Sequence, residues 1–563
     1  MRNHRESGVA VVKDKHMAEY LPPRELWPAR IYTLPEFQTY AQRFNPTEEL
    51  LGKAVAGGRG DRTAVLFEDQ KLTYNQLLTQ ANKFGSSLRE LGVDEGDRVL
   101  LRTPNIPPAL VANFGILRLG AVCTPTSPLF SRTEIAHVAN DAEAVAIVVS
   151  AMLLGEVEAA RENYKTVREI IVIGGDVAEV KAKGFRPYAE LVQAGSAQLD
   201  PVLRKREDVG LLLYTSGTTG RPKGTVHFVE ELLVIPDSFG KYGWRVSEND
   251  VIGGSAPLAF GAGYSSYATI PFRFGGAASL IAKFEPEKMF ETIQKHRISI
   301  LTLAPTAYRK MLQVPDAEKK YDLSSLKVCT GGGESLTAPT YHAWKEKFGL
   351  DIYEGLGTTE MMYVFASNVV SRKAKAGSFG QAVPGYELRV VDETGNPVPA
   401  GTIGHFMARG PTGTIYWRDP DKQRHAIAKE GWNRAGDFVY VDDDGYFWFV
   451  SREDDIIKSS AYRIGPEEIE VELATHPAVL DVGVIGVPDE IRGQIAKAFV
   501  VLKPGVSATP EELIEFCRGK IATYKLPREI VIVNELPRTP TGKLLRRVLR
   551  QREAETQQAK AAS

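Results

Sequence analysis

Short apolar runs alternate with amphipathic stretches from about residue 62 to residue 380, and this alternation limits the possible folds more than any other feature. The runs at 62–69 and 98–104 have the length of buried strands, and residues 74–91 between them repeat apolar side chains at helical spacing. Further apolar runs lie at 144–150, 168–175, 209–215, 298–305 and 325–332. Strands alternating with helices are typical of parallel sheets. We therefore predict an α/β fold of stacked, mostly parallel sheets with helices.

The length and a change of pattern predict the domain organisation. A chain of 563 residues is too long for one hydrophobic core. From about residue 383 short strands joined by Gly and Asn turns predominate, and a compact α+β pattern follows Arg452. We expect a large N-terminal domain at 1–452 that includes a β subdomain at about 383–452, and a small, mobile C-terminal domain at 453–550. The polar tail at 551–563 is expected to be disordered.

Charge and composition argue against several classes of protein. The 69 Lys and Arg residues nearly balance 70 Asp and Glu residues, which gives no electrostatic reason to expect nucleic acid as a partner. Three cysteines lie far apart without a CxxC pair, so neither a disulfide framework nor a zinc site is expected. No apolar stretch has the length of a signal peptide core or a membrane span. These features favour a cytoplasmic enzyme.

An apolar run at 209–214 leads into TSGTTGRPKG at 215–224, which has the composition of a phosphate-binding loop. Glycines allow backbone N–H groups to turn toward an anion, hydroxyls add donors, and Lys223 adds a positive charge. The loop is not the P-loop of NTPases, because Gly224 stands where that motif needs Ser or Thr after the lysine. On composition alone, nucleotide binding and an ordinary surface loop are both open.

The full string YTSGTTGRPKG resembles the signature loop of the adenylate-forming superfamily, which includes acyl-CoA synthetases, luciferases and the adenylation domains of peptide synthetases. Further segments resemble that family's motifs in the same order along the chain: LRLGAVCTPTSPLFS at 117–131, CTGGGESL at 329–336, EGLGTTE at 354–360, the stretch 434–458, and LPRTPTGKLLRR at 536–547. Together these segments identify the chain as a member of the superfamily.

The resemblance implies that a carboxylate attacks the α-phosphorus of ATP and that pyrophosphate leaves. Positioned cations and N–H donors would offset the repulsion between the two anions. The resemblance assigns the phosphates to Thr215, Ser216, Gly217, Thr218, Thr219, Gly220 and Lys223. It assigns the rest of the nucleotide site to Gly333, Glu334, Ser335, Gly357, Thr358, Asp437 and Arg452, the last two at the ribose.

The catalytic residues are assigned in the same way. Thr359 would contact the α-phosphate, Glu360 would help hold Mg²⁺, and Lys543 would bridge the carboxylate and the nucleotide. Taken alone, Lys543 belongs to a basic run that is typical of a solvated helix face. A protein that had lost the reaction would be expected to lack such charged residues.

A second half-reaction on coenzyme A is also implied by the resemblance. In the family the C-terminal domain rotates about a hinge after adenylation, and Asp454 occupies the hinge position. Arg463 would touch phosphate or stabilise the rotated state. Ala461 stands near the thiol path where the family usually has glycine.

The acid is suggested by a departure from the usual motif. Leu356 stands where many acyl-CoA synthetases have an aromatic residue, and EGLGTTEMMYVFASN resembles benzoate-type and aminobenzoate-type CoA ligases. Phe260 is a candidate gate and Tyr264 a candidate wall of a flat pocket, although both aromatics could equally be core residues. The floor would be Gly331 and Gly332 with Gly333.

We therefore predict an aryl acid–CoA ligase that uses ATP, Mg²⁺ and coenzyme A. A short-, medium- or branched-chain aliphatic acid is the alternative substrate class. An adenylating protein with another acceptor, and a nucleotide-binding homologue without activity, are more remote alternatives. The oligomeric state, monomer or homodimer, is left open.

Overall fold

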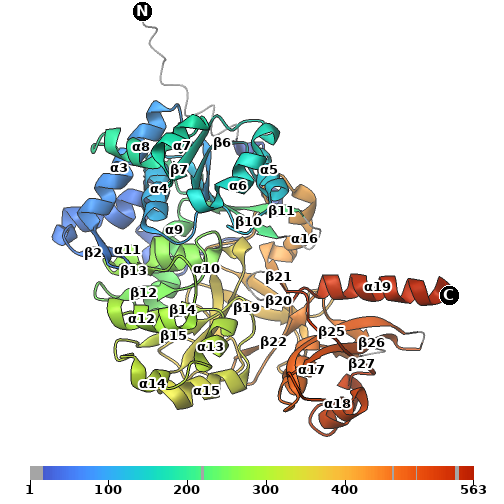
Figure 1. Cartoon of the computed structure of the whole chain (residues 1–563). Coiled ribbons are helices and arrows are strands. Elements are labelled where there is room, and N and C mark those ends of the chain that lie inside the picture. Colours follow the sequence, from blue (N-terminus) through green and yellow to red (C-terminus); the bar gives the residue numbers. More distant parts are fainter. Residues whose placement is uncertain (1–16, 217–220, 460–461, 490, 539–543, 563) are drawn as a thin grey trace, which may run out of the picture. The chain divides into compact units, whose positions relative to one another are not determined.

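The computed structural model describes residues 17–216, 221–459, 462–489, 491–538 and 544–562. The chain divides into two compact units (Figure 1). The first comprises residues 1–388 and 408–433, and the second comprises residues 389–407 and 434–563. The predicted α/β class is confirmed. No helix in the described ranges combines the length and apolar character needed to cross a membrane.

A seven-stranded sheet forms one layer of the first unit, in the order β11-β10-β5-β4-β6-β7-β8. All neighbours in it are parallel except β10 and β11, which form an antiparallel hairpin. The strands are β4 (Arg98–Arg102), β5 (Val122–Pro125), β6 (Ala144–Ser150), β7 (Glu169–Ile173), β8 (Arg186–Pro187), β10 (Val209–Ser216) and β11 (Pro222–Phe228). The connecting helices include α3 (Tyr74–Glu90), α4 (Pro107–Arg118), α5 (Arg132–Asp141), α6 (Leu154–Ala159), α7 (Val177–Ala182) and α8 (Tyr188–Ala194).

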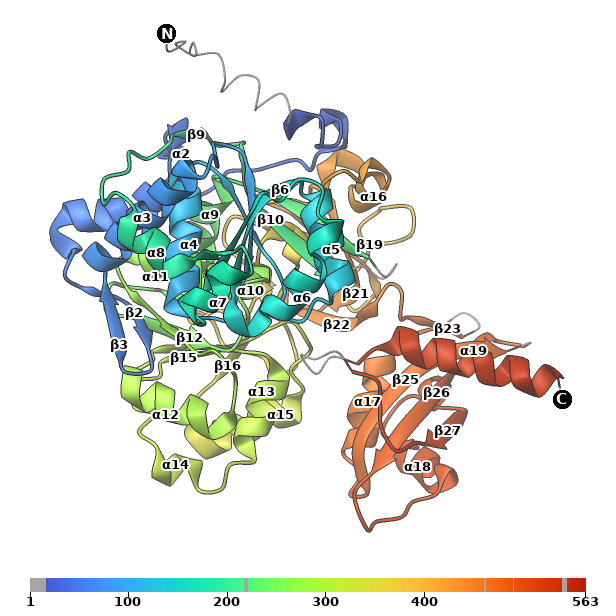
Figure 2. The same cartoon turned by 45° about the horizontal axis from the view of Figure 1, so that its top comes forward.

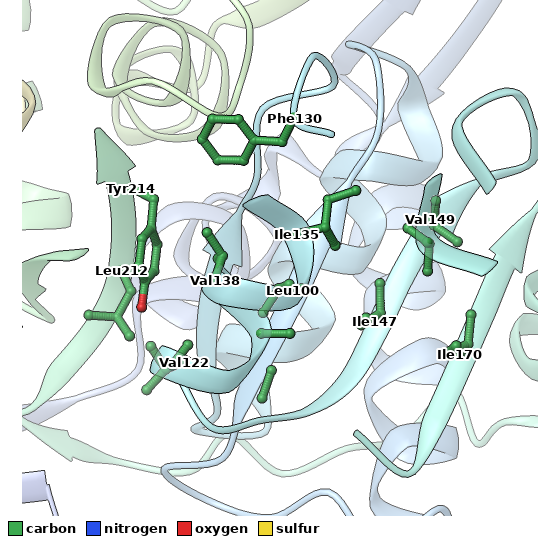
Figure 3. Packing of buried hydrophobic residues seen from close by; sticks show 14 of the residues in the cluster. Leu100, Val122, Phe130, Ile135, Val138, Ile147, Val149, Ile170, Leu212 and Tyr214 are labelled. Carbon is green, nitrogen blue, oxygen red and sulfur yellow. The ribbon is translucent and has the colours of Figure 1, made fainter. Parts of the chain in front are cut away.

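The core beside this sheet is built from β-branched and aliphatic side chains (Figure 3). Leu212, Val122, Leu100 and Ile147 come from four adjacent strands and are fully buried. Val138 of α5 covers them (Figure 3). Strands buried on both faces read as continuous apolar runs, which explains why the alternation was visible in the sequence.

A nine-stranded sheet forms the second layer of this unit, in the order β18-β17-β16-β15-β14-β12-β13-β2-β3. The strands from β2 to β16 along this order are parallel, and the edges are antiparallel. They are β2 (Thr63–Phe67), β3 (Gln70–Thr73), β12 (Val251–Gly254), β13 (Ala277–Leu280), β14 (Ile300–Leu303), β15 (Val328–Gly331), β16 (Ile352–Gly357), β17 (Val364–Ser367) and β18 (Gln381–Ala382). Helices α12 (Pro286–His296), α13 (Pro305–Leu312) and α15 (Ala338–Phe348) lie together beside it (Figures 1 and 2).

The second unit contains a five-stranded sheet with helices on both faces. Its strands are β23 (Ile457–Ser459), β24 (Tyr462–Ile464), β25 (Val479–Asp489), β26 (Gly493–Leu502) and β27 (Glu529–Ile532). Helices α17 (Pro466–Ala474) and α18 (Pro510–Cys517) cover one face. Helix α19 (Arg546–Ala562) covers the other through Leu549 (Figure 2).

The tail expected to be disordered is helical, so that prediction was wrong for residues 551–562. Ala, Gln, Glu and Arg are good helix formers, and the polar composition hid this preference. The helix is also held at its start, because Leu549 is buried and Glu553 accepts from the Lys497 ammonium at 2.8 Å in a buried pair.

The packing boundary also differs from the expected one. Most of a four-stranded sheet packs with the C-terminal unit, through residues 389–407 and 434–452. Its strands are β19 (Glu387–Val391), β20 (Gly404–Arg409), β21 (Asn433–Val441) and β22 (Phe447–Arg452). Phe438 and Val450 cluster with Ile456, and a Cβ at Gly465 would lie 2.3 Å from the Val450 carbonyl oxygen. The expected start of a mobile domain at 453 stays a prediction, because packing does not show where a chain rotates.

Leu212→Ala should destabilise the first unit by about 2–5 kcal/mol, because it leaves a cavity in a fully buried layer. Met152→Ala is the control, since Met152 is 73% exposed and its loss should cost less than about 0.5 kcal/mol. Urea denaturation followed by tryptophan fluorescence measures both. Equal effects of the two substitutions would contradict the layer described.

Candidate phosphate, acid and ribose sites

The hairpin β10–β11 presents the predicted phosphate loop. Thr215 pairs with Lys223 across the hairpin, and Thr215 is half-buried. Ser216 ends β10, while Gly217, Thr218, Thr219 and Gly220 lie outside the described residues. At the base of the loop the Tyr214 hydroxyl donates to Asp141 Oδ2 at 2.7 Å. Burial, and then Asp141, raise the pKa of Tyr214 well above its ordinary value, so this hydroxyl stays protonated and anchors the strand.

The segment 414–419 runs alongside β11 and was not singled out by the sequence. Its backbone pairs with the hairpin through Val226 N to Ile415 O at 2.8 Å and Trp417 N to Gly224 O at 2.9 Å. The Lys223 ammonium lies 3.0 Å from Asp419 Oδ2. Asp419 is the N-cap of helix α16 (Pro420–Ala426). An aspartate followed by a proline is a helix start signal that can be recognised in the sequence. Nothing in the spacing indicated its contact with Lys223.

Strand β16 ends at the predicted Thr-Thr-Glu turn. Gly357 is the last residue of the strand, and the Thr358 hydroxyl accepts from Met361 N at 3.2 Å, which closes a short turn over Thr359–Met361. Thr359 and Glu360 are half-buried at the carboxyl end of a parallel strand, where open α/β sheets bind ligands.

Glu360 has a partner that sequence reasoning missed. Tyr416 donates its hydroxyl to Glu360 Oε1 at 3.0 Å. Tyr416 belongs to the segment that also carries Asp419, so this segment touches both a predicted phosphate residue and the predicted metal residue. In the sequence, Tyr416 stands between Ile415 and Trp417, and nothing there indicated that role.

The glycine-rich segment follows the neighbouring strand, β15. Gly331 pairs with Glu354 of β16, and a Cβ at Gly332 would lie 3.1 Å from the Gly355 carbonyl oxygen, so a side chain there would press on β16. Gly333 has φ +87°, a conformation that favours glycine. The segment therefore keeps its own backbone close to β16.

The remaining residues of that segment are held by α13. Glu334 accepts from Thr306 N at 2.7 Å and from Arg309 Nη2 at 3.3 Å. This carboxylate therefore orients the segment, and Ser335 beside it is half-buried.

The predicted acid pocket is only partly supported by the side-chain positions. Leu356 is half-buried in β16, and Phe260 is half-buried at the start of α10 (Gly261–Tyr264). A Cβ at Gly261 would lie 2.0 Å from Met362 O, so this helix packs directly on the turn that carries Glu360. Tyr264 is 1% exposed and donates to Asn113 Oδ1 at 2.8 Å, which is the environment of a core residue.

The two predicted ribose residues come together in the second unit. Asp437 and Arg452 are register partners in the hairpin β21–β22, with Arg452 Nη1 2.9 Å from Asp437 Oδ1. The Asp437 side chain is buried, while the Arg452 side chain is 47% exposed. The adjacent turn is fixed by Glu453 N, which donates to Gly436 O at 3.0 Å.

Asp454, the predicted hinge, lies between Glu453, which is bonded to His405, and Asp455, which is paired with Arg550. Glu453 accepts from His405 Nδ1 at 2.6 Å, and His405 Nε2 lies 3.0 Å from Glu393 Oε2. Asp454 is exposed, and its carbonyl oxygen accepts from Arg550 Nη1 at 2.7 Å.

For the other residues predicted in the C-terminal domain, the structure describes little more than the backbone position of Arg463. Ala461 and Lys543 lie outside the described residues. Arg463 lies in β24, and its side chain is not described. Their roles stay predictions.

A magnesium ion fits the described residues only with help from the nucleotide. Glu360 offers one carboxylate, and no group of three or more His, Cys, Asp or Glu side chains in the described ranges could hold a metal. Mg²⁺ is often held by one or two carboxylates together with substrate phosphates and water, so a single glutamate is compatible with it.

Known families and proteins match most of the chain. Residues 53–417 match the model of the AMP-binding enzyme family, and residues 468–543 match the AMP-binding enzyme C-terminal domain. The chain is 34% identical over 516 residues to benzoate–CoA ligase of Thauera aromatica, covering 90% of this chain and 96% of that protein. It is 31% identical over 523 residues to acetyl-coenzyme A synthetase of Bacillus subtilis (strain 168), covering 90% of each. The structure of the anthranilate CoA ligase AuaEII in complex with anthranoyl-AMP aligns with TM-score 0.86 and 33% identity, over 93% of this chain and 99% of that one.

His405 should make the stability of the second unit depend on pH. Its hydrogen bond to Glu453, opposed by burial and reinforced by Glu393, raises the pKa of His405 above its ordinary value of 6.5. The stabilisation is therefore fully present below pH 6.5 and is lost as the pH rises through the folded-state pKa. His405→Asn should reduce the free energy of unfolding more at pH 6 than at pH 9, as measured by urea denaturation.

His425→Asn is the control for replacing a histidine, since His425 is exposed and its loss should cost less than about 0.5 kcal/mol. A loss from His405→Asn that is equal at the two pH values would show that the histidine acts only by packing.

Proposed function

Because the chain belongs to the AMP-binding enzyme family and is an AMP-forming acyl-CoA synthetase, we propose that its substrate is an aryl acid of the benzoate or aminobenzoate type. In the first half-reaction a carboxylate oxygen attacks the α-phosphorus of ATP, and pyrophosphate leaves. In the second, the coenzyme A sulfur attacks the acyl carbon, and AMP leaves.

One observation carries the choice of acid: an aliphatic residue, Leu356, stands at the end of β16 beside a glycine-rich neighbour. Gly332 carries no side chain, and a Cβ there would press on the Gly355 carbonyl oxygen at 3.1 Å, which favours a flat floor and hence a slot. A flat ring suits a slot because it can stack over its full face. Phe260 at the start of α10 is the aromatic we assign to this slot, and Tyr264 supports it from the core.

The first unit would supply most of the residues that act in adenylation. A carboxylate is already ionised at neutral pH, so the site needs no general base. Lys223 and the hydroxyls of the phosphate loop would stabilise charge on the leaving pyrophosphate, and Thr359 would position the α-phosphate. When bound, Mg²⁺ would neutralise charge on the phosphates, and Glu360 would help to hold it.

The second unit would supply the ribose site and the lysine. Asp437 is buried and oriented by Arg452, which suits it to accept hydrogen bonds from ribose hydroxyls. Lys543 would neutralise the attacking carboxylate and the α-phosphate during adenylation. Rotation at Asp454 would then remove it, and Arg463 would serve the thioester-forming state beside Ala461.

An aliphatic acid is the second candidate. The acetyl-coenzyme A synthetase of B. subtilis is nearly as similar to the chain as the benzoate ligase is. Pocket changes of one or two side chains alter discrimination by only about 1–3 kcal/mol, so overall similarity does not separate the two classes.

A substrate panel tests the proposed acid. With ATP, Mg²⁺ and coenzyme A, thioester formation from benzoate or 2-aminobenzoate should exceed that from isobutyrate, hexanoate and octanoate by at least about tenfold in kcat/KM. Phenylacetate tests whether an added methylene is tolerated. Pyrophosphate release without added acid is the blank, and a preference for any of the aliphatic acids would replace the aryl proposal by the second candidate.

Lys543→Ala tests the division between the two half-reactions. Adenylate formation should fall by about 100-fold or more, because the charge that offsets anion repulsion is removed. Thioester formation from supplied acyl-adenylate should stay within about threefold of the wild type, since the lysine has no part in that step. Arg547→Ala is a matched control, because it removes a nearby exposed charge. Equal loss in both half-reactions would refute the two-state scheme.

A further inference from the structure

The segment 414–419, which we call the bridging segment, contacts two predicted parts of the phosphate site within the first unit. It lies beside β11 through backbone hydrogen bonds from Val226 and Trp417. Two of its side chains contact predicted site residues. The Tyr416 hydroxyl donates to Glu360 Oε1 at 3.0 Å, and Asp419 Oδ2 lies 3.0 Å from the Lys223 ammonium. The sequence motifs assign no role to either side chain.

Asp419 uses its two carboxylate oxygens for different purposes. Oδ1 accepts from Lys422 N at 2.9 Å and caps helix α16, while Oδ2 meets the Lys223 ammonium. Burial alone would raise the pKa of Asp419, but the hydrogen bond from Lys422 and the charge of Lys223 outweigh it, and the pKa lies below its ordinary value. Asp419 is therefore an anion at neutral pH, and its second oxygen is available for exchange without loss of the helix cap.

We propose that Asp419 is the exchange partner of Lys223 in the phosphate site, a positioning role that rests on the function proposed above. Asp419 holds the lysine ammonium while no polyphosphate is bound, and gives it up when the ATP phosphates arrive. It takes the ammonium back as pyrophosphate leaves. The residue thus acts on nucleotide binding and product release through Lys223, without entering the chemical step.

The burial of the pair suits such an exchange. The side chains of Lys223 and Asp419 are 26% and 29% exposed, so water screens their attraction, and an ion pair of this kind is weak. A polyphosphate carries more charge than one carboxylate and therefore outcompetes it for the ammonium. While phosphate is bound, the carboxylate continues to compete for the ammonium, which weakens the hold of Lys223 on pyrophosphate.

The decisive variant is Asp419→Asn, since asparagine caps helices as well as aspartate does. It removes the competing charge and leaves the cap in place. We expect inorganic pyrophosphate to inhibit the variant about threefold to tenfold more strongly than the wild type, and MgATP without acid to bind more tightly by a similar factor. Inhibition kinetics and isothermal titration calorimetry measure the two effects.

Two comparisons separate this role from a structural one. Asp421→Asn alters an exposed carboxylate in the first turn of the same helix and should change neither affinity. Combined with Lys223→Gln, Asp419→Asn should change pyrophosphate inhibition by less than about twofold, because the exchange needs the lysine. The thermal unfolding midpoint of Asp419→Asn should equal that of the wild type.

The outcomes distinguish the inference from the function beneath it. A wild type that binds neither MgATP nor pyrophosphate would overturn the proposed function. A wild type that binds both, with Asp419→Asn unchanged or binding more weakly, would overturn only the exchange role. A gain that persists undiminished in the Lys223→Gln background would also overturn it, since the carboxylate would then act on phosphate directly.

Discussion

Two parallel strands that end at the same edge, β15 and β16, set the geometry on which the first unit's site depends. Their register places Gly331 opposite Glu354, so the chain leaves both strands within a few residues of each other. The segment after β15 carries the glycines and Glu334, and the turn after β16 carries Thr359 and Glu360. The carboxyl ends of parallel strands lie at the same edge of a sheet, and this brings together two predicted parts of the site from segments about 25 residues apart in sequence.

Much of this arrangement could be read from the sequence, because its physical basis is local. The apolar runs of β4, β6 and β10 are buried on both faces and stand out against their helical neighbours. The motifs on the loops after β10, β15 and β16 could be assigned by resemblance. What they contact depends on chain segments far away, and the sequence pattern does not report it. Tyr416 and Asp419 were missed for this reason, since they lie 56 and 196 residues from their partners Glu360 and Lys223.

The wrong expectations have a similar origin. Composition suggested disorder after residue 550, but Glu553 is paired with Lys497 and Leu549 is buried, contacts with strand residues about 50 positions away. The β subdomain was expected to belong with the large domain because it precedes Arg452. Its buried residues Phe438 and Val450 pack instead with Ile456 in the second unit. For Tyr264 the resemblance left a pocket wall and a core position open, and its burial and hydrogen bond to Asn113 of α4 are those of a core residue.

The chain around Asp454, the predicted hinge, is anchored differently on its two sides. Glu453 is tied by its carboxylate to His405 and by its backbone to Gly436, both in the four-stranded sheet. Two residues later, Asp455 is tied to Arg546 and Arg550 of α19, the helix that begins just after the Lys543 segment. The side-chain anchors therefore change from the sheet to α19 between 453 and 455, and the exposed Asp454 between them contacts α19 through its carbonyl oxygen. A rotation at Asp454 stays a prediction, and it would have to break the packing of Phe438 and Val450 against Ile456.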